Sequence, residues 1–286
     1  MEVTQVKNCF GQTINCVKND LISELIVKDG IYEKPSIDLM ISILKSIDNP
    51  IFLDVGANIG NHSLAVSNFA DCVLSFEPVP FTYNLLSENI KINNIDNIQA
   101  YNVAFSDENK VTDILFNMSG NIGGSTLELP SGNNKYNTIK IKAVVGDEFL
   151  SSKKIPKVDF IKIDVEGHEL HTLDGLKNTI IKNRPFIQME WNDEKIITGF
   201  LKFFENNMNG YHIYYLSDTL KTSGFSAPFS DMRKIMKYIY ANILKFKSRA
   251  FLRKEMHRSV KDVLLVPAEK NDLIDKKYFS RWVREN

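Results

Sequence analysis

The sequence predicts an α/β fold with a mostly parallel sheet and helices on both of its faces. Short apolar runs of strand length alternate with stretches of helical periodicity across residues 50–191. Such alternation is typical of parallel strands joined by crossover helices. Glycines and acidic side chains stand where several of these runs end, and open α/β sheets bind their ligands at these strand ends.

The composition is that of one folded unit with elaborations. Of the 286 residues, 43% are hydrophobic and 24% are charged, which excludes a disordered, collagen-like or coiled-coil chain. The 35 Lys and Arg residues balance the 35 Asp and Glu residues. The net charge therefore gives no indication of a nucleic-acid partner, and we expect none. The sequence leaves the oligomeric state open.

The cysteine content and the amino terminus lead us to expect a cytoplasmic protein. Cys9, Cys16 and Cys72 form no CxxC pair, which argues against a disulfide framework and against a four-cysteine zinc site. Residues 1–20 lack the apolar run of a signal peptide. No segment approaches the ~20 apolar residues that a membrane span needs.

Residues 1–49 are expected to form an extension in front of a main domain over residues 50–286. Weak alternation of apolar and polar residues predicts short strands or a hairpin in residues 1–30. From Pro35 to Ile47, apolar side chains recur at helical spacing and predict a helix.

Five strands and three helices are predicted in the first part of the main domain. The strands cover residues 50–56, 72–78, 97–105, 158–167 and 185–191. The helices cover residues 59–69, 82–93 and 170–181. Because crossovers between parallel strands are right-handed, the carboxyl ends of these strands should meet at one edge of the sheet.

Two longer segments interrupt this alternation. Residues 106–157 are too long for a plain connection and predict a hairpin or an active-site loop. Residues 211–216 and 262–268 predict two further strands. Between them, residues 231–259 carry nine Lys or Arg residues against two acids and have an apolar helical face. We therefore expect a basic helical insertion there.

A glycine-containing turn follows the first strand of the main domain. Gly56 and Gly60 permit a tight turn and a close approach of the backbone to a ligand, and Asn58 tolerates left-handed backbone angles. Asp54 stands in front of them, and its negative charge would repel a pyrophosphate. In its strand–turn–helix context, the turn therefore fits a ligand with a positive charge, such as an ammonium or a sulfonium group.

Glu77 ends the second strand, 23 residues after Asp54. An acid about 20 residues beyond such a turn commonly binds the hydroxyls of a ribose. A carboxylate accepts hydrogen bonds from a 2′,3′-diol through its two oxygens, whereas it would repel a 2′-phosphate.

Ionisable side chains gather at the ends of the fourth and fifth strands. Asp164, Glu166 and His168 close the fourth strand, and Glu190 closes the fifth. Neighbouring groups of this kind can have shifted pKa values and perform acid–base chemistry, or they can simply complement the dipole of the following helix. Oxygen ligands here could hold Mg²⁺, but the spacing does not require it, and the sequence leaves a divalent metal open.

Six motifs, in this order, resemble those of the FkbM-type S-adenosylmethionine-dependent methyltransferases. They are DVGANIG at 54–60, FEPVP at 76–80, NVAFSDE at 102–108, VVGDEFL at 144–150, FIKIDVEGHEL at 160–170 and RPFIQMEW at 184–191. The resemblance covers roughly residues 30–195, and the basic segment lies beyond it. It implies a class I methyltransferase fold, which is Rossmann-like with a seven-stranded, mostly parallel sheet, and S-adenosyl-L-methionine as the cofactor.

The resemblance also assigns residues to the cofactor. Around the methionine moiety it implies Asp54, Gly56, Asn58 and Gly60, with Asp164 near the same end. At the ribose it implies Glu77, and beside the adenine it implies Ala104 together with Asn102.

The implied activity is methyl transfer to a hydroxyl of a sugar, glycan or related small molecule, as in polysaccharide modification. A hydroxyl acceptor loses a proton when it is methylated, so a general base assists. His168 is our first candidate because an imidazole titrates near neutrality, and Glu166 and Glu190 follow it.

Two other functions stay open from the sequence. One is an NAD-dependent oxidoreductase on a similar sheet, against which Asp54 and the incomplete GxGxxG pattern argue. The other is a non-catalytic, cofactor-binding protein that docks on a membrane or a glycan. The segment 231–259 bears on the latter, because it fits three interpretations: a solvated helix, a contact for an anionic glycan or lipid-linked substrate, or peripheral attachment to the inner face of the membrane.

Overall fold

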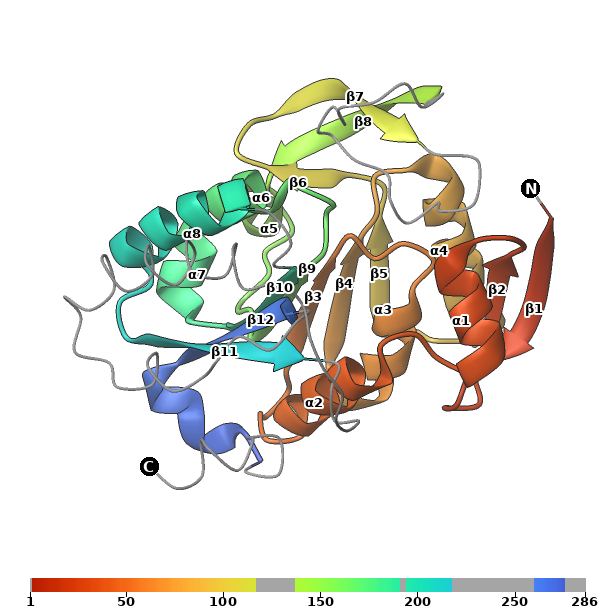
Figure 1. The fold of residues 1–286 in the computed structure, drawn as a ribbon, viewed down its shortest axis with the longest axis horizontal. Coiled ribbons are helices and arrows are strands. Elements are labelled where there is room, and N and C mark those ends of the chain that lie inside the picture. Colours follow the sequence, from red (N-terminus) through yellow and green to blue (C-terminus); the bar gives the residue numbers. More distant parts are fainter. Residues whose placement is uncertain (1, 117–136, 191–193, 218–259, 276–286) are drawn as a thin grey trace, which may run out of the picture.

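A seven-stranded sheet forms the centre of the computed structural model, which describes all residues except 1, 117–136, 191–193, 218–259 and 276–286 (Figure 1). The strand order is β11-β12-β10-β9-β3-β4-β5. The strands are β3 (Ile51–Val55), β4 (Cys72–Phe76), β5 (Ile98–Tyr101), β9 (Phe160–Ile163), β10 (Phe186–Glu190), β11 (Tyr211–Ser217) and β12 (Val260–Pro267). β12 runs antiparallel to β10 and β11, whereas the remaining pairs are parallel. The expected α/β class with a mostly parallel seven-stranded sheet is confirmed.

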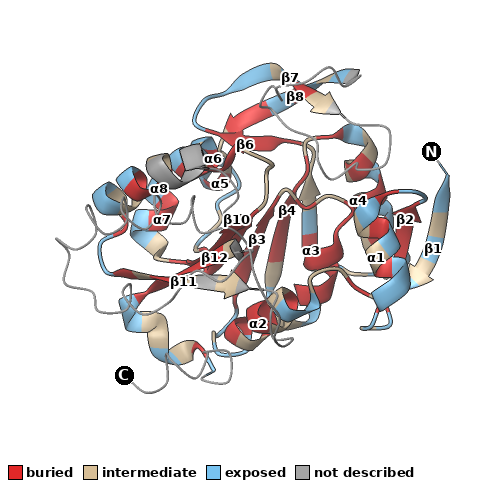
Figure 2. Ribbon diagram, in the orientation of Figure 1, coloured by how far each residue is buried: buried red, intermediate tan, exposed pale blue. Residues whose placement is uncertain are grey.

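Helices cover both faces of this sheet, and a hydrophobic core lies on each side. One core contains side chains of α2 (Lys34–Leu44), α3 (Asn61–Val66) and α4 (Pro80–Ile92). The other contains side chains of α5 (Gly146–Ser152), α6 (Glu169–Gly175), α7 (Lys177–Asn183) and α8 (Glu194–Asn207). Because side chains alternate along a strand, Phe52 of β3 enters the first core and Leu53 enters the second. Figure 2 shows the central strands as mostly buried.

The amino-terminal residues pack onto the first of these faces. β1 (Val3–Lys7) and β2 (Thr13–Val17) form the expected hairpin, and α1 (Leu21–Asp29) follows it. The amide of Asn15 donates a 2.7 Å hydrogen bond to Oδ1 of Asn89 on α4, and Ile14 belongs to the same core as α2. The segment in front of β3 thus shares its hydrophobic core with the central sheet.

A separate three-stranded sheet lies beside the main one, with the order β6-β8-β7. It contains β6 (Ala104–Ser106) and the antiparallel pair β7 (Lys110–Phe116) and β8 (Asn137–Val145). The expected hairpin within 106–157 is therefore present, but the single strand expected over 97–105 is wrong. The chain leaves β5 at Asn102, whose Nδ2 donates to the carbonyls of Glu77 and Pro78 at 2.8 and 2.9 Å, and then enters the smaller sheet.

Two of the expected helices are interrupted. The helix expected over 59–69 is α3 followed by a 3₁₀ turn (Ser67–Phe69), and the one expected over 170–181 divides into α6 and α7. Gly175 ends α6, where an added Cβ would lie 1.9 Å from the carbonyl oxygen of Ser106. This position therefore requires glycine, a poor residue for continuing a helix.

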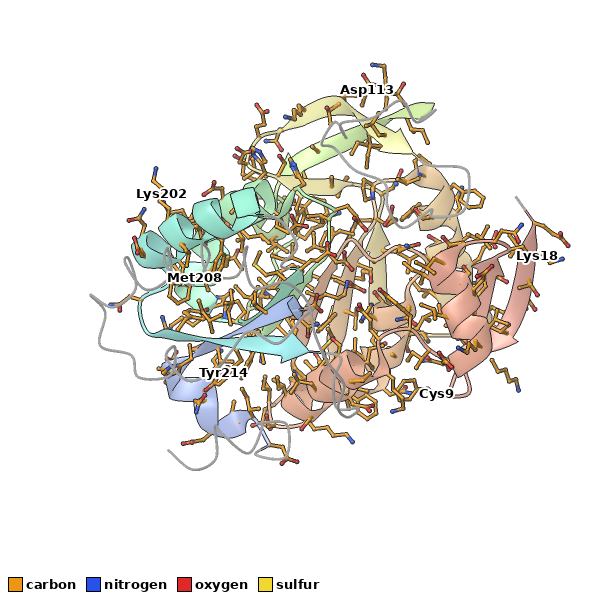
Figure 3. The ribbon with its side chains drawn as sticks, viewed as in Figure 1. Cys9, Lys18, Asp113, Lys202, Met208 and Tyr214 are labelled. Carbon is orange, nitrogen blue, oxygen red and sulfur yellow. The ribbon has the colours of Figure 1, made fainter. Side chains whose placement is uncertain are left out.

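The strands β11 and β12 confirm the two strands expected near the carboxyl end, and a 3₁₀ helix (Ala268–Leu273) follows them. α8 was not predicted. Its Lys202 lies on the outer surface, while Met208, which follows α8, is fully buried (Figure 3). Among the residues that the structure describes, every helix is too short or too polar to cross a bilayer.

Candidate active site

One pocket lies at the carboxyl edge of the central sheet. Its walls come from the ends of β3, β4, β9 and β10, from the segment in front of α2, and from β6 and β7. A volume of about 220 Å³ exceeds the ~15 Å³ that one buried water needs. The pocket is therefore of ligand size.

The glycine turn forms one wall of this pocket. Gly56, Asn58 and Gly60 all have left-handed φ angles, of 87°, 51° and 93°, as their residue types indicated. At Gly56 an added Cβ would lie 1.8 Å from the carbonyl oxygen of Asp164. The turn after β3 and the end of β9 are therefore in direct contact, and only glycine fits between them. Gly60 does not line the pocket: an added Cβ there would meet Leu86 at 2.6 Å.

Glu77 joins the turn to the next strand. Its Oε2 accepts a 2.8 Å hydrogen bond from the amide of Asn58. Its Oε1 accepts hydrogen bonds from the amide of Val79 at 2.9 Å and the hydroxyl of Thr82 at 2.7 Å. The side chain is buried, which raises its pKa, and these hydrogen bonds partly oppose the rise. Glu77 therefore lies in the pocket wall with its orientation fixed.

An apolar wall continues from Glu77. Ala104 lines it together with Val103 and Phe105 from the segment around β6. Asn102, expected beside the adenine, does not line the pocket, because its side chain holds the carbonyls of the Glu77–Pro78 segment. It supports the wall from outside.

Asp54 also lies outside the pocket lining. It is the fourth residue of β3 and is fully buried. The sheet register places Ser75 and Lys162 beside it on the neighbouring strands, and Gln188 beside Lys162. Oδ2 of Asp54 accepts a 2.5 Å hydrogen bond from Ser63, while Oδ1 has no hydrogen-bond partner among the described residues. Asp54 thus belongs to a polar row beneath the pocket.

Lys162 is a buried cation in that row, and the sequence interpretation missed it. Its Nζ lies 3.0 Å from Oδ2 of Asp164. Burial alone would lower the pKa of Lys162, but the charges of Asp164, Asp54 and Glu33 raise it above the usual range. The lysine is therefore charged and lines the pocket. A charged residue inside the apolar run FIKID was the available signal.

The acids at the ends of β9 and β10 meet as expected. Ile163 pairs with Met189 in the parallel register, so Asp164 and Glu190 follow side by side. Oxygens of Asp164, Glu166 and Glu190 all lie within 4.8 Å of one another. We call these three residues the carboxylate cluster. Carboxylate oxygens at this spacing match the donor chemistry of a divalent cation such as Mg²⁺.

Asp262 extends this cluster and was not predicted. β12 is antiparallel to β10 and pairs Asp262 with Glu190. The beginning of β12 therefore lies at the same sheet edge as the ends of the parallel strands. The sequence showed a strand here but not its direction, which explains why Asp262 was missed.

Burial and mutual repulsion raise the pKa values of these acids. Burial, followed by the charge of Asp164, raises the pKa of Glu166 to about 7 and that of Glu190 to about 8. Burial and the charge of Glu33 raise the pKa of Asp262 to about 7. Near neutral pH these side chains can therefore both donate and accept hydrogen bonds.

His168 lines the pocket, but its environment disfavours a positive charge. Burial, followed by the charge of His171, lowers its pKa to about 4. Its Nε2 lies 3.0 Å from the hydroxyl oxygen of Ser106. These surroundings make His168 a weak base near neutral pH, which argues against our first choice of general base.

The sequence interpretation assigned no site role to a further group of pocket residues. Tyr32 and Glu33 come from the segment in front of α2, and His62 comes from α3. Asn61 fixes this contact: its Oδ1 accepts from the amide of Tyr32 at 3.2 Å, and its Nδ2 donates to the carbonyl of Tyr32 at 3.0 Å. A Glu and a His 29 residues apart gave no local signal that they would meet.

Other sequence-based expectations fall on residues that the structure does not describe. The basic segment 231–259 lies outside the described part of the chain, as does residue 191, the last one of the strand expected over 185–191.

Known proteins resemble this chain over about half its length. Hexuronic acid methyltransferase AglP of Haloferax volcanii is 32% identical over 142 residues, which cover 46% of this chain and 52% of that protein. The 2-O-methyltransferase NoeI of Sinorhizobium fredii is 27% identical over 177 residues, which cover 56% of this chain and 70% of that protein. The chain thus spans about half the length of AglP.

Among solved structures, methyltransferase FkbM from Methylobacillus flagellatus KT is 16% identical, with a TM-score of 0.43, over 58% of this chain and 40% of that one. The model of the methyltransferase FkbM domain matches residues 54–247. This span is more than half of the chain and begins at the glycine turn. The chain therefore belongs to the family defined by the methyltransferase FkbM domain.

Proposed function

We propose that this protein transfers the methyl group of S-adenosyl-L-methionine to a hydroxyl of a sugar, a glycan or a related small molecule. The observation that carries the proposal is the pocket itself. It brings together the glycine turn, Glu77 and the carboxylate cluster at one sheet edge. The bound cofactor would supply an electrophilic methyl group on a sulfonium, and the protein would orient the acceptor against it.

The residues of the turn suit the cofactor. Glu77 would accept hydrogen bonds from the ribose hydroxyls, because each carboxylate oxygen can accept more than one. Ala104 and its apolar neighbours would pack on the adenine. Gly56 and Asn58 would face the methionine end, where Asp164 offers a carboxylate to the ammonium group. Lys162 neutralises part of the acidic charge there.

Asp54, Gly60 and Asn102 would act on the cofactor indirectly. Asp54 contributes to the row beneath the pocket, Gly60 to the packing of the turn on Leu86, and Asn102 to the wall below the adenine. We therefore propose a supporting role for these three residues.

Glu166 and Glu190 would bind the acceptor. A carboxyl group with a raised pKa near neutrality can donate a hydrogen bond to one hydroxyl of a sugar and accept one from another. A divalent cation in the carboxylate cluster would bind the same hydroxyls. Loss of turnover in EDTA, with recovery on adding Mg²⁺, would support the cation, whereas unchanged turnover would exclude it.

The names of two relatives support a sugar acceptor. AglP is a hexuronic acid methyltransferase, and NoeI is a 2-O-methyltransferase. The matched region covers only part of each relative, 52% of AglP and 70% of NoeI. The acceptor class therefore needs a direct test. Transfer of the labelled methyl group from radiolabelled S-adenosylmethionine would be measured on a panel of methyl hexosides and methyl hexuronosides.

Ligand-binding measurements distinguish methyl transfer from the two alternatives, an NAD-dependent oxidoreductase and a non-catalytic cofactor-binding protein. We expect calorimetry to show that S-adenosylhomocysteine binds and NAD does not, because Glu77 suits a ribose diol while the acids of the pocket repel a pyrophosphate. Tight binding of NAD alone would favour the oxidoreductase. Binding of S-adenosylhomocysteine without transfer to any acceptor in the panel would favour a non-catalytic cofactor-binding protein.

The basic segment 231–259 supports a contact with an anionic partner. Its nine cationic side chains would attract an acidic glycan or the anionic inner face of a membrane. We propose such a contact for a protein that works in the cytoplasm. Binding to anionic liposomes that is lost on deleting the segment would support membrane attachment, and binding unaffected by the deletion would contradict it.

A further inference from the structure

The pocket wall contains a histidine and a glutamate that meet away from the carboxylate cluster. Nε2 of His62 lies 3.3 Å from Oε2 of Glu33, which is an ion-pair distance, although the two groups are not aligned for a hydrogen bond. The side chains are only 7% and 15% exposed. Both line the same pocket as Glu77 and Asp164.

Two features of the backbone hold this pair in place. The double hydrogen bond from Asn61 to the backbone of Tyr32 fixes the residue next to each partner. Glu33 itself has a left-handed backbone, with φ 53° and ψ 41°, and makes no side-chain cap on α2. Such a conformation is strained for glutamate, and strain of this kind clusters at functional sites. The side chain of Glu33 is instead directed to His62.

Glu33 is an anion despite its burial. Burial alone would raise its pKa, but the interaction with the adjacent His62, together with the charge of Lys162, lowers the pKa to about 2. Other charged groups near the pair are Asp164, which follows β9, and Asp262 on β12, and the Tyr32 hydroxyl also faces Glu33. A carboxylate in this position stabilises the positive charge that an imidazole acquires when it accepts a proton.

We propose that His62, oriented by Glu33, is the general base that accepts the proton of the acceptor hydroxyl. This inference rests on the proposed methyl transfer and names a catalytic residue for it. Nε2 faces Glu33 and is shielded from solvent, so Nδ1 receives the proton. As the acceptor oxygen bonds to the methyl carbon, the carbon–sulfur bond breaks and its electron pair stays on sulfur. The hydroxyl proton passes to Nδ1, and Glu33 balances the new charge.

The other basic groups of the pocket are less suited to this role. His168 has a pKa near 4 and contacts Ser106. Glu190, with a pKa near 8, is mostly protonated at neutral pH, and Glu166, with a pKa near 7, is about half protonated. These two acids suit acceptor binding better than proton removal.

The experiment compares His62→Gln, Glu33→Gln and His168→Gln with a matched control, His212→Gln, whose histidine lies on β11 outside the pocket lining. Turnover is measured on the sugar panel, and S-adenosylhomocysteine affinity is measured by calorimetry. We expect His62→Gln to lower kcat by about 10²–10⁴-fold, the usual contribution of a general base, with little change in affinity. His168→Gln should lower kcat less than His62→Gln does, and His212→Gln should have the kcat of the wild type.

Two further measurements distinguish a catalytic role of His62 from a structural one. Imidazole added to His62→Ala should restore part of the turnover, which a structural role would not allow. The acid limb of the kcat/KM profile should disappear in His62→Gln, because the base that protonation would inactivate is gone. If His62→Gln is unfolded by circular dichroism, Glu33→Gln decides: it should lower kcat without changing the affinity for S-adenosylhomocysteine, and an unchanged kcat overturns the inference.

The outcomes distinguish this inference from the proposed function. A wild-type protein that methylates no sugar in the panel contradicts the acceptor class and with it the role of His62. An active wild type with equally active His62→Gln overturns only the base assignment. Loss of S-adenosylhomocysteine affinity in His62→Gln, in proportion to the loss of turnover, would make His62 a cofactor-binding residue and would also overturn it.

Discussion

The backbone amide of Asn58 donates a 2.8 Å hydrogen bond to Oε2 of Glu77. The glycine turn after β3 and the acid after β4 are therefore one unit. Oε1 of the same carboxylate accepts hydrogen bonds from Val79 and Thr82. Glu77 therefore connects the turn after β3 to the start of α4. A change at Glu77 should consequently affect the turn as well as the ligand.

Glu77→Gln should weaken the binding of S-adenosylhomocysteine. The amide group of glutamine would have to face one of the N–H or O–H donors that now bind a carboxylate oxygen. A lost buried hydrogen bond costs about 1–3 kcal/mol, which corresponds to roughly 10–100-fold in affinity. Calorimetry would measure this loss. Glu108→Gln, an exposed acid on the β6–β7 turn, is the control, and equal affinities in both variants would contradict the assignment.

Gly56→Ala should destabilise the protein more than Gly11→Ala. Both glycines have left-handed backbones, with φ of 87° and 80°. Alanine at Gly11 has free space and bears only the conformational cost, about 1–2 kcal/mol. At Gly56 the new Cβ would also collide with the carbonyl oxygen of Asp164. Urea unfolding would measure the unfolding free energy of both variants. Equal losses would contradict the prediction, because they would show that the ends of β3 and β9 can move apart without cost.

Asp54→Asn should reduce stability more than cofactor affinity. Asp54 is fully buried, lies outside the pocket lining and supplies part of the negative charge around Lys162. Removing one partner of a buried charge costs on the order of 3 kcal/mol, although Asp164 still pairs with the lysine. Thermal unfolding and calorimetry would measure the two effects. Asp113→Asn, on the outer surface of β7 (Figure 3), is the control. A large loss of affinity with unchanged stability would place Asp54 against the ligand.

Glu190→Gln should make the protein more stable at pH 8 but not at pH 5. Burial and neighbouring acids raise the folded-state pKa of Glu190 to about 8, above its unfolded value. The native state therefore binds a proton more tightly, and this stabilisation is complete at low pH and lost as the pH rises towards 8.

The neutral amide removes this loss. Since one pKa unit corresponds to about 1.4 kcal/mol, a gain of a few kcal/mol in unfolding free energy is expected at pH 8. Unfolding would be followed at both pH values in EDTA, to keep divalent cations from the carboxylate cluster. Glu108→Gln again serves as the control, and a gain at pH 5 equal to that at pH 8 would contradict the raised pKa.

Much of the sheet could be predicted because its signals are local. Apolar runs of strand length marked β3, β4, β9 and β10, and left-handed angles at Gly56 and Asn58 followed from residue type. The strand expected over 97–105 failed because the Asn102 side chain turns the chain out of the sheet. That turn depends on carbonyls from residues 77 and 78, which no local pattern reveals.

The sequence by itself determined the α/β class, the glycine turn and the gathering of Asp164, Glu166 and Glu190 at one edge. These features follow from periodicity, from backbone preferences and from the parallel direction of neighbouring strands. Only the tertiary structure decided that Asp54 lies beneath the pocket, that Asp262 joins the acids and that His62 meets Glu33. Those contacts depend on strand register, on the antiparallel direction of β12 and on the docking of α2 against α3. Each joins residues too far apart in the chain for any local preference to specify.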